Sequence, residues 1–136
     1  MVERLVANEK VEGSTPFARS KIMSDLLKKK CLPCEGGVVP FDISEIHKYQ
    51  KKVDGWDIVK DKNEIYFLKK NFKFKNFLES EKFTKQVGKL AELEGHHPDI
   101  SYGWGYANIS ITTHAIEGLS ENDFILAAKI DTITNA

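Results

Sequence analysis

Residues 92–114 read ELEGHHPDISYGWGYANISITTH, and most of the predicted architecture can be worked out from this stretch. Gly95 ends a helical pattern and is a natural C-terminal stop for a helix. Apolar and polar residues then alternate along 107–113, which is typical of a β-strand with one face in the core. With the shorter arm 100–102 and the glycine-containing turn 103–106, the stretch predicts a helix end followed by an antiparallel hairpin.

The residues on either side of this stretch follow a helical repeat. From about Lys75 to Glu94, apolar residues recur at helical spacing, which predicts a long helix before Gly95. On the other side, Ser120 is a typical N-cap residue with acidic residues in the next turn. The apolar residues from Phe124 to Ile130 then predict a closing helix.

Two more elements are predicted nearer the N-terminus. Residues 42–50 begin with helix-capping residues and place apolar residues on one face, which predicts a short first helix. Residues 56–59 and 65–68 flank a polar link and predict a first hairpin. The order α-β-β-α-β-β-α contains no strand–helix–strand repeat that would require a parallel sheet. We therefore expect an α+β fold, with an antiparallel sheet and helices packed on one face.

The composition indicates one globular domain. The chain has 136 residues, 41% of them apolar, and its 20 basic and 20 acidic residues balance, so it is long enough to bury a core. Zero net charge disfavours direct nucleic-acid binding, which needs a basic surface. The longest apolar run, 124–128, is far shorter than the ~20 residues of a membrane helix, and no leader pattern opens the chain. We expect a cytoplasmic protein without membrane contact.

Residues 1–22 differ from the rest of the chain. Gly13-Ser14-Thr15-Pro16 interrupts any periodicity, so this extension is predicted to be disordered. The codons of these four residues can contain the T-arm consensus of a transfer-RNA gene, so a start-site misassignment is a further hypothesis. Translation would then begin at Met23, and a single domain would span 23–136.

Two cysteines, Cys31 and Cys34, form a lone Cys-Leu-Pro-Cys. No second pair of metal ligands follows at zinc-site spacing, and no secretory signal suggests an oxidising compartment. Two inert thiols are expected, while a redox role and a metal shared between subunits stay open as alternatives.

Three histidines flank the predicted second hairpin. His96 and His97 precede it and His114 follows it, so antiparallel pairing would bring them together. The unperturbed pKa of imidazole lies nearest neutrality, which suits proton transfer in both directions. Pro98 favours extended backbone at His97, where neighbouring side chains point to opposite sides, so His96 and His97 are expected to play unequal parts. Solvated histidines at a helix end, or a metal site, are the alternatives.

The histidines belong to a longer pattern, which consists of residues 92–99, Thr112-Thr113-His114, Gly118-Leu119 and Asp123. This pattern resembles the signature of the pterin-4a-carbinolamine dehydratases, also called 4a-hydroxytetrahydrobiopterin dehydratases or dimerisation cofactors of a hepatocyte homeodomain factor. The resemblance extends in looser form over about residues 25–133, and residues 31–37 resemble an opening common in bacterial members.

The resemblance implies a four-stranded antiparallel sheet backed by helices, and a homodimer or homotetramer. It implies dehydration of a 4a-hydroxytetrahydropterin to quinonoid dihydropterin and water, in tetrahydrobiopterin recycling for an aromatic amino acid hydroxylase such as phenylalanine hydroxylase. No metal and no other cofactor is implied. Two alternatives remain: a non-catalytic interaction protein, as animal relatives are for a transcription factor, and a dehydratase for another pterin.

The resemblance also implies roles for individual residues. The catalytic residues it implies are His96, His97 and His114. The pterin pocket is implied to include Gly95, Thr112, Thr113 and Ala115, with Glu92, Pro98 and Asp123 in support. Glu92 and Asp123 would each orient an imidazole, the alternatives being a surface charge and a helix cap. The chain departs from animal members at Ile100, where they carry a tryptophan near the pterin, which leaves the preferred pterin substituent open.

The predicted roles of the aromatic residues outside this pattern are less specific. Phe72, Phe74 and Phe77 are expected to pack in the core or at an interface. Trp104 lies in a glycine-flanked turn, where it would either pack on a neighbouring subunit or contact a ligand.

Overall fold

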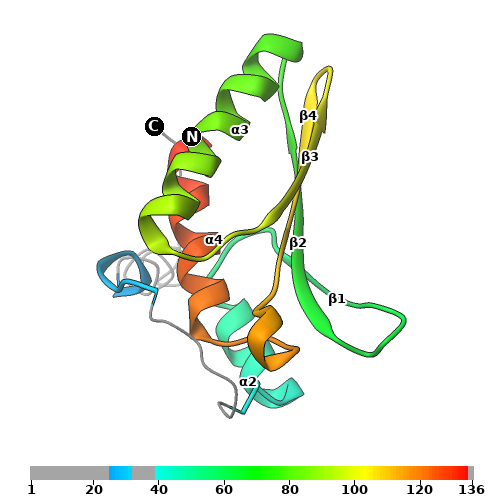
Figure 1. Ribbon diagram of the computed structural model, residues 1–136, viewed down its shortest axis with the longest axis vertical. Helices are drawn as coiled ribbons and strands as arrows, with labels where there is room; N and C mark the ends of the chain where they lie inside the picture. Colours follow the sequence, from blue (N-terminus) through cyan, green and yellow to red (C-terminus); the bar gives the residue numbers. More distant parts are fainter. Residues whose placement is uncertain (1–24, 32–38, 135–136) are drawn as a thin grey trace, which may run out of the picture.

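The computed structural model describes residues 25–31 and 39–134 (Figure 1). Residues 1–22 and Cys34 lie outside these ranges. Disorder of the N-terminal extension and a translation start at Met23 therefore stay predictions.

The fold has two layers, a sheet and a set of helices that cover one of its faces (Figure 1). The four antiparallel strands lie in the order β1-β2-β4-β3, and their bounds are Asp57–Lys60 (β1), Tyr66–Lys73 (β2), Asp99–Gly103 (β3) and Tyr106–Ile111 (β4). Apart from one helical turn over residues 25–28, the helices are α2 (Ile43–Gln50), α3 (Phe77–Glu94) and α4 (Glu121–Thr134), with a 3-10 turn, η2 (His114–Ile116), between β4 and α4. The predicted α+β class and element order are confirmed.

The ends of the helices lie close to their predicted positions because the capping residues act locally. Asp42 accepts a hydrogen bond from the backbone N–H of Glu45 at the start of α2, and Asn76 accepts one from Glu79 at the start of α3. Gly95 ends α3 in the left-handed region, with φ of 67°. Side-chain acceptors at the N-cap and a left-handed glycine after the last turn are the usual terminators of helices.

Strand β2 is longer than predicted. The sequence indicates a strand over 65–68, whereas β2 continues to Lys73. Residues Leu68 to Lys73 pair with β4 in the centre of the sheet, which adds a second row of backbone hydrogen bonds. The sequence did not predict this continuation, because Lys70 is a charged residue on the side of the strand that faces the core.

The core lies between the sheet and α4. Leu68, Ile109 and Ile111 of the sheet are fully buried against the helical layer. Helix α4 is buried over all of Asn122–Ala128, as expected of a central helix. Each fully buried large apolar side chain contributes about 1.5–3 kcal/mol. This packing holds the first turn of α4 in place. None of the helices within the described ranges is long and apolar enough to cross a membrane.

Candidate active site

The three histidines that flank the second hairpin meet at one cavity. In the register of β3 and β4, Asp99 lies opposite Ser110, so the start of β3 is beside the end of β4. A cavity of about 240 Å³ opens there. It is lined by Gly95, His96, His97, Thr112, Thr113, His114, Ala115 and Asn122. All of these except Asn122 are residues that the sequence singled out.

The backbone at the end of α3 turns sharply into this cavity. The N–H of Gly95 donates to the carbonyls of Ala91 and Glu92, and the N–H of His96 donates to Ala91. Because Gly95 adopts φ of 67°, the chain leaves the helix axis at once and His96 starts a new direction. The left-handed conformation of Gly95 therefore sets the direction in which the chain continues to His96 and His97.

His96 is held against a buried carboxylate. Its Nε2 lies 2.7 Å from Oδ1 of Asp123, and the Asp123 side chain is fully buried while that of His96 is 12% exposed. The other oxygen of Asp123 accepts hydrogen bonds of 2.8 Å from Thr113 Oγ1 and from the Ser120 backbone N–H. When Nε2 donates to the carboxylate, the ring is held in one orientation and Nδ1 is the nitrogen that carries the lone pair.

Asp123 thus fills two roles that the sequence left as alternatives, a helix cap and a residue that orients an imidazole. Its bond to the Ser120 N–H satisfies a donor at the start of α4, which is a helix cap. Its other oxygen orients His96. One carboxylate therefore links the start of α4 to the imidazole, so that helix packing sets the position of the ring.

His97 occupies a different environment from its neighbour. Its Nε2 lies 2.6 Å from Oε1 of Glu92, with 61% of the histidine side chain and 79% of the glutamate side chain exposed. Ion pairs in water contribute little and are screened by salt. Glu92 therefore partners His97 rather than His96, and the two neighbouring imidazoles differ in solvation, as the extended backbone before Pro98 predicts.

His114 and the two threonines come from the turn after β4. His114 is exposed and begins η2. Thr113 pairs with Gly118 across this turn, through its N–H and the Gly118 carbonyl. Thr112 Oγ1 donates to the Tyr66 carbonyl at 2.8 Å. Both threonine hydroxyls have partners within the protein, so contacts to a ligand at these positions fall mainly to backbone groups.

Asn122 is the lining residue of this cavity that the sequence did not predict. It is 7% exposed and stands directly before Asp123. A polar residue beside a predicted helix cap usually faces solvent, so its position in the chain carried no signal. The packing of the first turn of α4 turns it towards the histidines instead.

Two features lie away from the histidine cavity. Trp104 is 70% exposed at the turn between β3 and β4, the end of the hairpin opposite to His97 and His114. It does not line the cavity, which leaves packing on another subunit as its predicted role.

Burial raises the pKa of the Cys31 thiol to about 12, and the nearby Glu94 adds to the rise. Because the thiolate is the reactive species, this thiol is a poor nucleophile at neutral pH.

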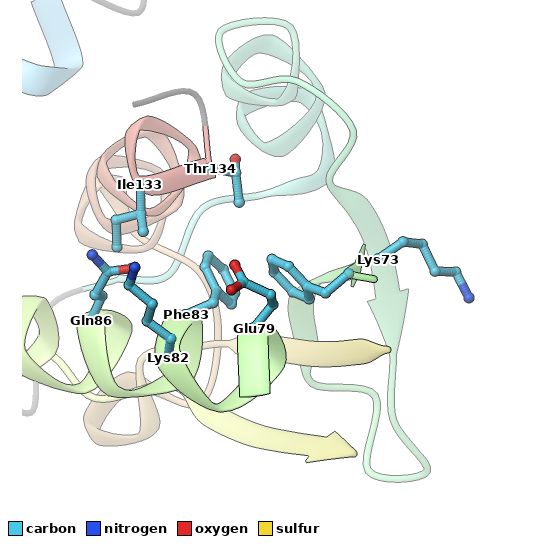
Figure 2. A pocket seen from close by; sticks show the side chains of 8 residues that line it. Lys73, Glu79, Lys82, Phe83, Gln86, Ile133 and Thr134 are labelled. Carbon is cyan, nitrogen blue, oxygen red and sulfur yellow. The ribbon is translucent and has the colours of Figure 1, made fainter. Parts of the chain in front are cut away.

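A larger and separate cavity, of about 450 Å³, lies between the first turns of α3, the end of β2 and the end of α4 (Figure 2). Its charged residues are Lys73, Glu79 and Lys82, and its lining includes Phe83 and Ile133. It contains no histidine and none of the predicted site residues. Within the described ranges, no three His, Cys, Asp or Glu residues converge as a metal site would require. The histidine cavity is therefore the candidate active site.

Known proteins resemble this chain across the site. The family model for pterin 4 alpha carbinolamine dehydratase matches residues 39–133. A protein of Rubrobacter xylanophilus is 45% identical over 109 residues, which cover 80% of this chain and 98% of the relative. One of Methylococcus capsulatus is 47% identical over 106 residues, which cover 78% and 90%. Both are described, provisionally, as pterin-4-alpha-carbinolamine dehydratases.

Two solved structures share the fold. The crystal structure of a transcriptional coactivator/pterin dehydratase from Brucella melitensis matches with a TM-score of 0.63 at 28% identity, over 69% of this chain and 97% of that chain. A pterin dehydratase-like protein identified as a RuBisCO assembly factor in the alpha-carboxysome matches with a TM-score of 0.51 at 24% identity, over 60% and 92%. The second likeness concerns the fold alone.

Proposed function

Because this chain belongs to the pterin 4 alpha carbinolamine dehydratase family, we propose that it dehydrates a 4a-hydroxytetrahydropterin to quinonoid dihydropterin and water. The observation that carries the proposal is the convergence of His96, His97 and His114 on one cavity, with Asp123 buried behind His96. In the reaction the C4a–oxygen bond breaks and the hydroxyl leaves as water. The neighbouring ring nitrogen loses a proton, and its electron pair forms the C=N bond.

The reaction needs one group that gives a proton to the departing hydroxyl and one that takes a proton from the ring nitrogen. His96 is suited to hold the proton that is taken up, since Asp123 stabilises its imidazolium form. His97 and His114 are exposed imidazoles at the same cavity and can exchange protons with solvent. Proton transfer by positioned imidazoles contributes about 10²- to 10⁴-fold to a rate.

The remaining residues serve binding and support in this proposal. Backbone groups of Gly95, Thr112, Thr113 and Ala115 contact the pterin ring. Glu92 and Asp123 orient His97 and His96, and Pro98 keeps the two imidazoles apart. The physiological role that follows is recycling of tetrahydrobiopterin for an aromatic amino acid hydroxylase such as phenylalanine hydroxylase, in the cytoplasm, without a metal or other cofactor.

A homodimer or homotetramer is part of the proposal. Four aromatic side chains near the β3–β4 turn are partly or largely exposed: Phe77 (45%), Tyr102 (38%), Trp104 (70%) and Tyr106 (37%). The rings of Phe77 and Tyr102 contact each other with centroids 5.7 Å apart. Exposed apolar groups of this size often mark an interface, and β3 is an edge strand of the sheet.

The same surface supports a second candidate function, a non-catalytic interaction protein. The relative from Brucella melitensis is described as both a coactivator and a pterin dehydratase, so the fold alone does not choose between the two. A pure scaffold requires packing surfaces but no convergent imidazoles. The histidine cavity therefore favours the dehydratase, and a dehydratase acting on another pterin shares this chemistry.

The decisive experiment is a stopped-flow assay of 4a-carbinolamine breakdown. The wild-type protein is expected to exceed the buffer reaction, while His97→Ala and His114→Ala each lose about 10²-fold or more of kcat. His47→Ala is the matched control, because His47 is an exposed histidine of α2 outside the cavity. Circular dichroism checks that each variant is folded. A wild-type rate equal to that of buffer would reject the dehydratase.

A further inference from the structure

A second cavity adjoins the histidine cavity on the open face of the sheet. It measures about 230 Å³ and shares two lining residues, Thr112 and His114, with the histidine cavity. Its other walls come from the β1–β2 hairpin and from the paired positions Asp99 and Ser110 of β3 and β4. Apart from these two shared residues, only Asp99 belongs to the sequence pattern that resembles the family signature, and no role was assigned to it there.

The lining of the second cavity has a definite chemistry. Half-buried Phe67 supplies an apolar wall, and Asp61 and Asp99 supply carboxylates. Oδ1 of Asp61 accepts hydrogen bonds from the backbone N–H groups of Asn63 (2.8 Å) and Ile65 (3.0 Å), so the turn holds this carboxylate in place. The lining includes no Lys or Arg among the residues that the structure describes.

The bonding of a pterin decides which part of it would reach this cavity. C4a, which loses the hydroxyl, is bonded to N5, and N5 is bonded to C6, which carries the variable substituent. C6 therefore lies two bonds from the reacting carbon and the first atom of its substituent three, whereas the 2-amino group lies on the far side of the pyrimidine ring. Since His114 lines both cavities, a ring that presents C4a to the histidines has its C6 substituent nearest to the second cavity.

We propose that the second cavity is the subsite for the C6 substituent, and that Asp61 and Asp99 select neutral, hydroxyl-bearing substituents over anionic ones. Carboxylates accept hydrogen bonds from substituent hydroxyls, and Phe67 packs against the carbon chain. A phosphate ester on the same chain meets two like charges, which costs binding energy. This inference rests on the proposed function and names the substrate class of that site.

The test compares two ligands that differ by one phosphate group on the substituent, 7,8-dihydroneopterin and its phosphate monoester. Isothermal titration calorimetry of the wild-type protein is expected to give about 10-fold tighter binding of the neutral ligand. In Asp61→Asn/Asp99→Asn, this ratio is expected to fall to about 3-fold or less. The Asn side chain at position 61 keeps the oxygen that accepts the two turn hydrogen bonds.

The control is Asp57→Asn, which removes a carboxylate from the same hairpin. Asp57 is exposed on β1 and does not line either cavity, so the wild-type ratio is expected to persist. The subsite is wrong if the wild-type protein shows no preference, if the double variant keeps the ratio, or if Asp57→Asn lowers it equally. Failure of the proposed function looks different, because then neither ligand binds and carbinolamine breakdown is not accelerated.

Discussion

Asp123 connects the chemistry of the site to the fold through a single side chain. One oxygen faces His96 and the other accepts from Thr113 and the Ser120 N–H. Glu92, by comparison, meets His97 in solvent. The two acid–histidine pairs have similar distances, 2.7 and 2.6 Å, but burial makes only the first a strong determinant of ring orientation.

This contrast predicts unequal losses on neutralising the two acids. In Asp123→Asn, the amide cannot stabilise an imidazolium at His96, so kcat is expected to fall about 100-fold or more. Glu92→Gln is expected to cost less than about 5-fold, since that pair is exposed. Nitrogen-15 NMR of His96 separates positioning from a merely structural effect, because Asp123→Asn should change its tautomer in the folded protein. Equal losses in the two variants would contradict this assignment.

At the scale of one element, two glycines of α3 and its C-terminal cap need opposite backbone conformations. Gly88 lies inside the helix, whereas Gly95 ends it at φ of 67°. A Cβ added at either position meets no atom within 4 Å. Any effect of alanine there is therefore due to backbone conformation rather than to a clash.

The two alanine substitutions are expected to change stability in opposite directions. Gly95→Ala should lower the free energy of unfolding by about 1 kcal/mol, because an L-residue is strained in the left-handed region. Gly88→Ala should raise it by about 1 kcal/mol, because alanine loses less backbone entropy in a helix. Urea unfolding monitored by circular dichroism measures both. A Gly95→Ala protein that is as stable as the wild type, or more stable, would show that Gly95 is not needed as a left-handed stop.

At the scale of the whole molecule, a buried ion pair ties the sheet to α4. Lys70 Nζ of β2 lies 2.8 Å from Oδ1 of Asp131, a residue of α4 that is 3% exposed. The indole N–H of Trp56 also donates to this carboxylate. Burial raises the pKa of Asp131 above its ordinary value, and Lys70 opposes the rise. Because the folded state holds the proton on Asp131 more tightly than the unfolded state does, protonation of Asp131 favours folding at low pH, and this gain is lost as pH rises through the folded pKa.

Lys70→Met is therefore expected to be more harmful at pH 7 than at acidic pH. At pH 7 it leaves an ionised carboxylate buried without its cation, which should cost about 3 kcal/mol. Near pH 4 the cost should be smaller, because Asp131 takes up a proton. Denaturant unfolding at the two pH values measures the difference, with Lys69→Met, an exposed neighbour on β2, as control. A loss independent of pH would mean that packing of the lysine stem, not charge, is what matters.

Association of whole chains is the second prediction at this scale. Sedimentation velocity at micromolar concentration is expected to show a dimer or tetramer. Trp104→Ser should shift the population towards the monomer, because it removes the largest exposed apolar group at the β3–β4 turn. Val39→Ser removes another exposed apolar side chain, 81% accessible and outside the strands, and should leave the mass unchanged. A monomeric wild-type protein would rule out the proposed oligomer.

Features that depend on near neighbours in the chain could be predicted from the sequence. The caps at Asp42 and Gly95 and the alternation along β4 involve residues only a few positions apart, so local backbone preferences decide them. The meeting of His97 and His114 could be predicted for the same reason, because one tight hairpin joins them. The α+β class followed from the order of these local elements.

Features that depend on the pairing of distant strands and on burial could not be predicted and became visible only in the folded structure. The pairing of β2 with β4 extended β2 to Lys73, and it placed Lys70 opposite a carboxylate 61 positions away. The packing of α4 placed Asp123 behind His96 and turned Asn122 into the cavity. The adjoining cavity with Asp61 likewise exists only where separate hairpins meet. The physical reason is that hydrophobic burial is non-directional, so the partner of a side chain across the core is set by how all the elements pack together.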